Sequence, residues 1–399
     1  MKSKKQNDEL ADLFGEALDK LQQGKELSGK DGALRPLIKR LLEVSLDAEL
    51  DEHVGKSKTN RRNGRGRKTV KTSQGPVDID TVRDRDGSFE PQIIGKRQTT
   101  LGPSVDNKIL SLYAMGMSYR DIREHVDEMY GLSLSPATLT AITDQIWPEV
   151  QAWRERPLDR KYACVWLDAM HYKVREEGVV EKRAVYMVLA RKLNGHKELL
   201  GFYVSKSESA KFWMQVLNDL QQRGVEDILI CCIDNLKGFV QAIESVFPKT
   251  DVQLCIVHQV RNSMRYVPWS DQREVVRDLK EIYRAANEER GLEKLDKFEE
   301  KWSPRYKPMV DSWRRNWAEL ATMFKYPAPI RKMIYTTNII EGFHRQIRKV
   351  TKTKGAFSND RALIKLLYLS QDRIAKDWQR APRDWTVGNR SPVKLAVWF

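Results

Sequence analysis

Five short apolar runs between residues 163 and 258 constrain the fold more than any other feature of the chain. They are rich in β-branched and aromatic residues, which is typical of buried strands: "ACVWLDAM", "RAVYMVLA", "ELLGFYVS", "DILICCID" and "VQLCIVH". Short connections join the first three, as between antiparallel neighbours. Helical stretches precede the fourth and fifth, which indicates parallel pairing. This order predicts an α/β fold with a ribonuclease H-like mixed five-stranded sheet.

The flanking segments are predicted to be mostly helical. Residues 7–54 carry apolar residues at helical spacing, typical of either a dimerisation arm or a face packed on its own chain. Residues 103–153 have a helix-turn-helix form, with Gly116 ending one helix, Ser118 and Asp121 capping the next, and Ser135 opening the third. Residues 269–330 are predicted to form an all-helical insertion.

The insertion contains four tryptophans, for which two interpretations stay open. They could stack on nucleic-acid bases or brace the core of the insertion. They are Trp269, Trp302, Trp313 and Trp317.

These patterns divide the chain into five predicted regions. They are a helical arm, basic loop and hairpin for DNA binding or dimerisation (1–98), a helix-turn-helix-like DNA-binding region (99–155), the first part of a catalytic domain (156–268), the helical insertion (269–330), and the rest of the catalytic domain with a C-terminal tail (331–399).

An excess of positive charge favours a polyanionic partner, most simply nucleic acid. The chain has 70 Lys and Arg against 55 Asp and Glu, a formal net charge of +15. Residues 56–71, "KSKTNRRNGRGRKTVK", contain no acid, and their Asn and Gly residues predict a loop followed by a β-hairpin that turns near residues 74–76. We expect this loop to contact DNA phosphates through Arg61, Arg62, Arg65, Arg67 and Lys68.

Other classes of protein have little support in the sequence. The four cysteines lie in apolar runs without a regular framework, which predicts reduced thiols in a cytoplasmic protein. The N-terminus lacks the apolar segment of a signal peptide, and no apolar run approaches the roughly 18 residues of a membrane span. We therefore expect no membrane association. No phosphate-loop spacing supports nucleotide hydrolysis.

Two aspartates end predicted strands and are the strongest candidates for chemistry. Asp168 follows "CVWL" and Asp234 follows "ILICCI", and a carboxylate after such a run is costly unless a cation or solvent meets it. Ligands of α/β sheets gather at the carboxyl ends of strands. If the two strands are neighbours, their carboxylates repel, and Mg²⁺ or Mn²⁺ would relieve that repulsion.

A third carboxylate, Glu341, is a candidate for the same site. It lies near the start of a predicted helix after Thr336 and Thr337, and Arg345 and Arg348 follow on the same face, with Lys349 beside them. Three carboxylates could hold two metal ions while the cations hold phosphates. The spacing equally permits a simple Glu341–Arg345 pair on a solvated helix face.

The segment "CIVH" places Cys255 and His258 at the end of the last predicted strand. This spacing is half of a zinc site, but no second Cys/His pair lies nearby, and His171 and His344 are isolated in the sequence. We therefore expect Cys255 and His258 to support the acidic cluster rather than to bind zinc.

Several stretches together resemble the IS256 family, the Mutator-like transposases of bacterial insertion sequences. The resemblance spans about residues 35–380 and is carried chiefly by "RRNGRGRKTVKT", "DRDGSFEPQII", "LSLYAMGMSYRDI", "VWLDAMHYKVR", the region from "ESAKFW" to "CIVHQVRNS", and "YTTNIIEGFHRQIRK". It implies a DDE transposase whose catalytic residues match Asp168, Asp234 and Glu341, and whose Cys-x-x-His signature matches Cys255 and His258. It further implies Mg²⁺, which Mn²⁺ can replace, double-stranded DNA as terminal inverted repeats and target, a homodimer, and a place at the bacterial nucleoid.

Two alternatives to a complete transposase follow from the same residues. A nuclease would keep the fold without strand transfer, and a DNA-binding regulator would keep only the scaffold. The N-terminal DNA-binding segments argue against the nuclease, and the three carboxylates argue against the regulator.

Overall fold

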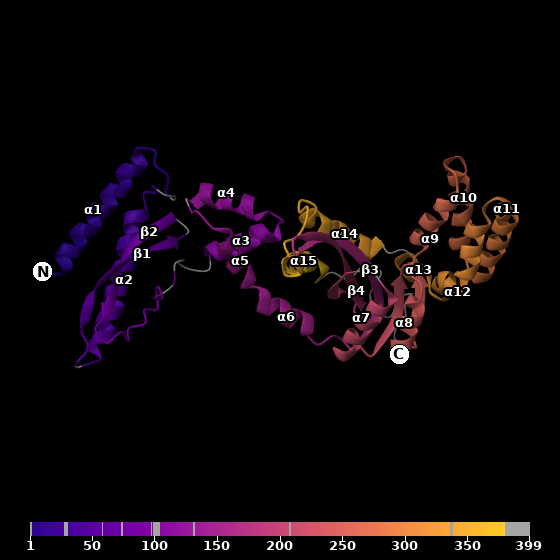
Figure 1. Cartoon of the computed structure of the whole chain (residues 1–399), viewed down its shortest axis with the longest axis horizontal. Helices are drawn as coiled ribbons and strands as arrows, with labels where there is room; N and C mark the ends of the chain where they lie inside the picture. The colour runs from indigo at the N-terminus through magenta and orange to yellow at the C-terminus, as the bar shows by residue number, and fades with distance from the viewer. Residues whose placement is uncertain are drawn as a thin grey trace. The chain divides into compact units, whose positions relative to one another are not determined.

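The chain divides into two units, Met1–Ile146 and Trp147–Phe399 (Figure 1). The computed structural model describes residues 2–27, 31–57, 59–72, 75–96, 98, 104–130, 132–206, 209–335 and 338–379. Among these residues, no helix is both long enough and apolar enough to cross a bilayer.

The first unit begins with two helices and a β-hairpin. These are α1 (Lys2–Gln22), α2 (Arg35–Gly55), β1 (Arg62–Thr72) and β2 (Gly75–Asp84). One face of α2 packs on the hairpin through Leu42, Leu46, Leu50, Val70, Val77, Ile79, Val82, Phe89 and Ile94. By contrast, α1 leaves Phe14 and Leu18 at least half exposed.

The basic segment 56–71 is largely a β-strand, so its prediction as a loop is wrong. β1 pairs antiparallel with β2 from Arg62 to Thr72, which confirms the hairpin but extends it into the segment assigned to the loop. Gly64 adopts a φ of 68° where the register shifts between Arg62 and Arg65. The glycine therefore accommodates a bulge within the strand instead of ending it, while burial of Val70 against α2 holds the strand in place.

Three helices complete the first unit: α3 (Ser104–Ala114), α4 (Tyr119–Tyr130) and α5 (Pro136–Asp144). The predicted capping of α4 is confirmed, because the Ser118 N–H donates to Asp121 and the Asp121 N–H donates to the Ser118 hydroxyl, each at 3.1 Å. Ser135 caps α5 by accepting from the Thr138 N–H. Local sequence therefore sets the ends of these helices.

A mixed five-stranded sheet forms the centre of the second unit. Its order is β5-β4-β3-β6-β7, with antiparallel pairing among β3, β4 and β5 and parallel pairing of β6 and β7, as predicted. The strands are β3 (Lys161–Glu176), β4 (Val179–Lys192), β5 (Lys197–Ser205), β6 (Asp227–Ile233) and β7 (Asp251–Leu254). The crossover helices are α7 (Ala210–Gln222) and α8 (Phe239–Val246).

Helices cover both faces of this sheet. In Figure 1, α7 and α8 lie on one side of the strands, and α14 (Asn338–Thr351) and α15 (Asp360–Ala375) lie on the other. The six consecutive residues from Tyr162 to Leu167 in β3 are all buried, which requires protein on both faces. The strands are continuously apolar because both of their faces are buried.

The fifth apolar run contains a strand end and a helix start, so its prediction as a single strand is partly wrong. β7 ends at Leu254, Cys255 is the N-cap of α9 (Ile256–Ser263), and His258 lies inside this helix. The run is apolar throughout because Leu254, Cys255 and Ile256 are all buried.

A helical region follows α9 in the chain. It comprises η1 (Met264–Tyr266), α10 (Trp269–Tyr283), α11 (Glu288–Arg315), α12 (Trp317–Ala321), η2 (Thr322–Lys325) and α13 (Ala328–Ile334), while α6 (Trp147–Glu155) precedes β3 and η3 (Lys376–Gln379) follows α15. Trp302 and Trp313 are buried and brace this region, whereas Trp269 is 88% exposed.

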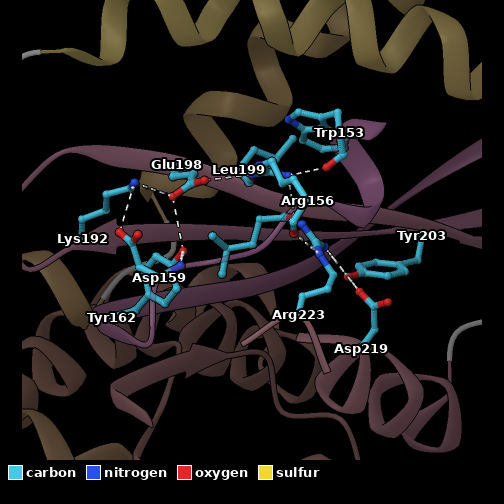
Figure 2. Close-up of polar contacts among 11 residues, drawn as sticks. Trp153, Arg156, Asp159, Tyr162, Lys192, Glu198, Leu199, Tyr203, Asp219 and Arg223 are labelled. Atoms are coloured by element: carbon cyan, nitrogen blue, oxygen red, sulfur yellow. Dashed lines mark hydrogen bonds and ion pairs between the residues drawn. The ribbon is translucent and has the colours of Figure 1, made fainter. Parts of the chain in front are cut away.

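A polar network fixes the edge of the sheet where β3 begins (Figure 2). The Arg156 guanidinium donates to Glu198 at 2.9 Å and to the Leu199 carbonyl at 2.7 Å, and it stacks on Trp153. Lys192 pairs with Asp159 and Glu198. These contacts tie the segment between α6 and β3 to β4 and β5.

Replacing Trp313 by Ala is expected to destabilise the second unit strongly. The indole is fully buried and its Nε1–H donates to the Ser263 hydroxyl at 2.9 Å, so truncation leaves a cavity and removes one buried hydrogen bond. We expect a loss of about 3–5 kcal/mol in the free energy of unfolding, measured by denaturant titration followed by circular dichroism. The control Trp269→Ala removes an exposed indole and is expected to change it by less than about 0.5 kcal/mol. Equal effects of the two variants would contradict this assignment of the core.

Candidate active site

Strand register places Asp168 beside Asp234. The last residue pair between the parallel strands β3 and β6 is Leu167 with Ile233, and each aspartate is the next residue in its chain. The two carboxylates therefore follow equivalent positions of neighbouring strands, at the edge where β6 ends. The Asp168 side chain is 15% exposed and that of Asp234 is 35% exposed.

Helix α14 brings Glu341 to the same edge. Glu341 lies in the first turn of α14, and the helix packs on β3 with Ile340, Phe343, His344 and Ile347 buried. Thr336 and Thr337, which the sequence places before this helix, lie outside the described residues. The contacts of Glu341 are with His258 at 3.7 Å and Arg261 at 4.0 Å.

Burial and the neighbouring acids both act on the pKa of Asp234. Burial raises the pKa of Asp234, and the neighbouring charges of Asp168 and Glu341 raise it further, while His258 opposes the shift. The ionised form of Asp234 is therefore disfavoured without an added positive charge. A cation between these carboxylates would remove this penalty.

His258 bridges two of the acids. Its Nδ1 lies 2.5 Å from Asp234 Oδ1, and its Nε2 lies 3.7 Å from Glu341 Oε1. Asp234 Oδ1 and His258 Nδ1 are both buried, and neither has another hydrogen-bond partner among the described residues. Contact with Asp234, followed by contact with Cys255, raises the pKa of His258 to about 10. The imidazolium therefore supplies part of the missing positive charge.

His344, isolated in the sequence, contacts the remaining acid. Its Nδ1 lies 3.2 Å from Asp168 Oδ2, and the residue is 4% exposed. His344 and Arg261 are the site residues that sequence reasoning missed. Their spacing is the signal that could have found them. His344 follows Glu341 by three residues and Arg261 follows His258 by three, and residues at this spacing share a helix face.

A second set of donor atoms overlaps the carboxylates. Atoms of Asp234, Cys255 and His258 all lie within 4.8 Å of one another, and a thiol, an imidazole and a carboxylate are ligands that Zn²⁺ accepts. Asp168, Asp234 and Glu341 instead offer the oxygen ligands that Mg²⁺ and Mn²⁺ prefer. Asp234 belongs to both sets.

The cations proposed to contact DNA differ in the partners that they already have within the chain. Arg62 pairs with Asp47 and Asp51, and Arg65 pairs with Asp47. Lys68 donates to the Gly95 carbonyl, and burial lowers its pKa. Arg62 and Arg65 are nevertheless exposed, as are Arg61, Arg67, Arg345, Arg348 and Lys349.

Comparison with known proteins identifies the family. The model of the family described as "Transposase, Mutator family" matches residues 12–381. The chain belongs to the Mutator family of transposases. It is 44% identical over 393 residues to the transposase for insertion sequence element ISRM3 of Rhizobium meliloti, covering 96% of this chain and 97% of the relative.

More distant relatives are also insertion-sequence transposases. The transposase for IS256 in transposon Tn4001 of Staphylococcus aureus is 23% identical over 377 residues, covering 92% of this chain and 96% of the relative. Among solved structures, the Drosophila P element transposase strand transfer complex matches with a TM-score of 0.40 and 12% identity, covering 71% of this chain and 94% of that one.

The pairing of His258 with Asp234 predicts a loss of stability at high pH in metal-free buffer. Because the folded pKa of His258 is raised from 6.5 to about 10, its contribution is complete below 6.5 and is lost as pH rises through about 10. We expect the wild type to lose its stability advantage over His258→Gln across that range, measured by denaturant unfolding at each pH. A difference between the two proteins that stays constant with pH would contradict the pairing.

Proposed function

We propose that this chain is a DDE transposase. It binds the terminal inverted repeats of an insertion sequence, cleaves phosphodiester bonds at the ends, and joins the freed 3′-hydroxyl to target DNA. The convergence of Asp168, Asp234 and Glu341 at one edge of the sheet, in a member of the Mutator family, carries this proposal. The sheet order, with three antiparallel strands followed by two parallel ones, supports a ribonuclease H-like catalytic domain.

The three carboxylates would hold divalent cations, most simply Mg²⁺ or Mn²⁺. Burial, together with the neighbouring charges of Asp168 and Glu341, raises the pKa of Asp234, and this shift supports the fit because a bound cation would oppose it. When bound, two such ions activate the attacking water or 3′-hydroxyl and stabilise the leaving oxygen. Asp168, Asp234 and Glu341 would orient the ions, and His258, with Cys255 beside it, would support Asp234 from α9.

Basic side chains around the site would hold the DNA strand. Arg261 lies 4.0 Å from Glu341, and Arg345, Arg348 and Lys349 are exposed on the helix that carries Glu341. Guanidinium groups suit phosphate oxygens because they can donate two hydrogen bonds at once. In this proposal they position the scissile phosphate over the carboxylates.

The other parts of the chain would recognise the element ends. We propose that α3–α5 form a helix-turn-helix-like DNA-binding region, that the β1–β2 hairpin follows the DNA backbone, and that α10–α12 form an insertion within the catalytic domain. The exposed Phe14 and Leu18 on α1 support a dimerisation arm in a homodimer that holds two ends. The bacterial insertion-sequence relatives support action at the nucleoid.

Removing any one of the three carboxylate charges is expected to abolish catalysis without abolishing DNA binding. Metal ligation needs charged oxygens, whereas phosphate contacts use Lys and Arg. We expect Asp168→Asn, Asp234→Asn and Glu341→Gln to block end cleavage and strand transfer in Mg²⁺ or Mn²⁺, in an assay with the element's own ends. Gel-shift affinity for those ends is expected to remain within a few-fold of the wild type.

A matched control separates this effect from a general loss of charge. Glu244 is exposed on α8, and we expect Glu244→Gln to keep both cleavage and joining. Wild-type strand transfer by one of the three site variants would exclude that residue from catalysis. Cleavage without joining in the wild type would favour the nuclease, and end binding without either reaction would favour the regulator.

Ion pairing within the first unit predicts unequal effects of the hairpin arginines on DNA binding. Each phosphate contact adds about 0.9 to the slope of log K against log salt. We expect Arg61→Ala with Arg67→Ala to flatten the slope by up to about 2 units, because both side chains are exposed. Arg62→Ala with Arg65→Ala is expected to change it less, because these arginines already pair with Asp47 and Asp51.

The slope is measured by titrating salt against binding of the terminal repeat. An unchanged slope for Arg61→Ala with Arg67→Ala would show that the hairpin does not contact the DNA backbone. Loss of discrimination between terminal and random DNA at a constant slope would instead indicate base recognition.

A further inference from the structure

Helix α14 carries a second polar residue, the buried His344, toward the catalytic edge. His344 follows Glu341 by three residues, which puts the two side chains on neighbouring positions of one helix face. Glu341 lies near His258 and Arg261, whereas the Nδ1 atom of His344 lies 3.2 Å from Asp168 Oδ2. The same helix therefore reaches both α9 and β3.

The Asp168 carboxylate is held at both of its oxygens. The Ala169 N–H donates to Oδ1 at 2.8 Å, and Nδ1 of His344 faces Oδ2. Two contacts on different oxygens restrict rotation of the carboxylate about its Cβ–Cγ bond. The lone pairs left free therefore have a fixed direction, as a metal ligand requires.

Packing alone does not account for a histidine at this position. His344 is 4% exposed, and its Nε2 is buried without a hydrogen-bond partner among the described residues. A buried unpaired ring nitrogen is costly, and an apolar side chain between Phe343 and Ile347 would avoid that cost. The 3.2 Å contact of Nδ1 with Asp168 Oδ2 supplies a reason for the imidazole.

We propose that His344 is a positioning residue that orients Asp168 for metal binding. Its Nδ1–H donates to Asp168 Oδ2, so docking of α14 sets the direction of the Asp168 carboxylate at the same time as it delivers Glu341. This inference rests on the proposed function, because it assumes that Asp168 binds the divalent ion. It concerns a residue that the Cys255–His258 pair and the three carboxylates do not include.

The test compares three substitutions of His344 in the full chain. Asn can place its amide N–H near the position of Nδ1, Gln places its amide closer to the position of Nε2, and Leu keeps similar bulk without a donor. We measure Mn²⁺ binding to the DNA-free protein by electron paramagnetic resonance, affinity for the terminal repeat, and cleavage as a function of Mn²⁺ concentration. Ile340→Val is the matched control, because it alters packing of the same helix face without removing a donor.

We expect His344→Leu and His344→Gln to weaken Mn²⁺ binding by about 10–100-fold, with cleavage partly recovered at high Mn²⁺ and DNA affinity unchanged. His344→Asn is expected to stay within about threefold of the wild type. Ile340→Val is expected to lower the thermal midpoint without changing Mn²⁺ affinity. A Leu variant with wild-type Mn²⁺ affinity, or Asn and Leu variants that are equally impaired, would overturn the positioning role.

The same measurements separate this inference from the proposed function. If Mn²⁺ binds the wild type and is lost in Asp168→Asn, but His344→Leu has no effect, only the inference about His344 fails. If the wild type binds no Mn²⁺, or Asp168→Asn binds it unchanged, metal ligation by Asp168 fails, and the inference fails with it.

Discussion

The pairing of β3 with β6 is the constraint on which the candidate site depends. Leu167 opposite Ile233 brings Asp168 and Asp234 to the same level of adjacent parallel strands. A slip of one residue would turn one aspartate toward the other face of the sheet and separate the carboxylates. Burial of both faces of these strands makes such a slip costly, because the apolar side chains of β3 and β6 would also exchange faces. The stability of the sheet core and the geometry of the acidic cluster therefore have the same origin.

The helical region between α9 and α14 begins and ends close to the same place in the structure. This proximity explains how Glu341 comes to lie beside the sheet. The Ile256 N–H, at the start of α9, donates to the Tyr335 carbonyl just after α13. Asp251 of β7 accepts from Lys325 and Tyr326, and Gln253 donates to the Leu320 carbonyl. These contacts fasten the end of the helical region to the last strand. Helix α14 can therefore begin close to α9, and Glu341 can meet His258 although many residues separate them in the chain.

The sequence predicts much of this architecture because its local signals agree with the packing. Asp168 and Asp234 could be singled out because each interrupts an apolar run, while spacing alone left Glu341 undecided and the family resemblance favoured it. The basic segment 56–71 was mispredicted because Asn and Gly favour loops, and burial of Val70 on α2 overrode that preference. The contact of His344 with Asp168 joins α14 to β3, and no local pattern encodes such a contact. Ion pairing of Arg62 and Arg65 with α2 was hidden for the same reason.

The central claim is that Asp168, Asp234 and Glu341 form one divalent-metal site. Anomalous diffraction from crystals soaked in Mn²⁺ tests it most directly, because the scattering locates the ion without reference to activity. The account predicts an anomalous peak bonded to carboxylate oxygens of Asp168 and Asp234, with Glu341 at the same ion or at a second one beside it. A peak held by Asp234, Cys255 and His258 without Asp168 and Glu341, or no peak at a Mn²⁺ concentration that supports DNA cleavage, would contradict it.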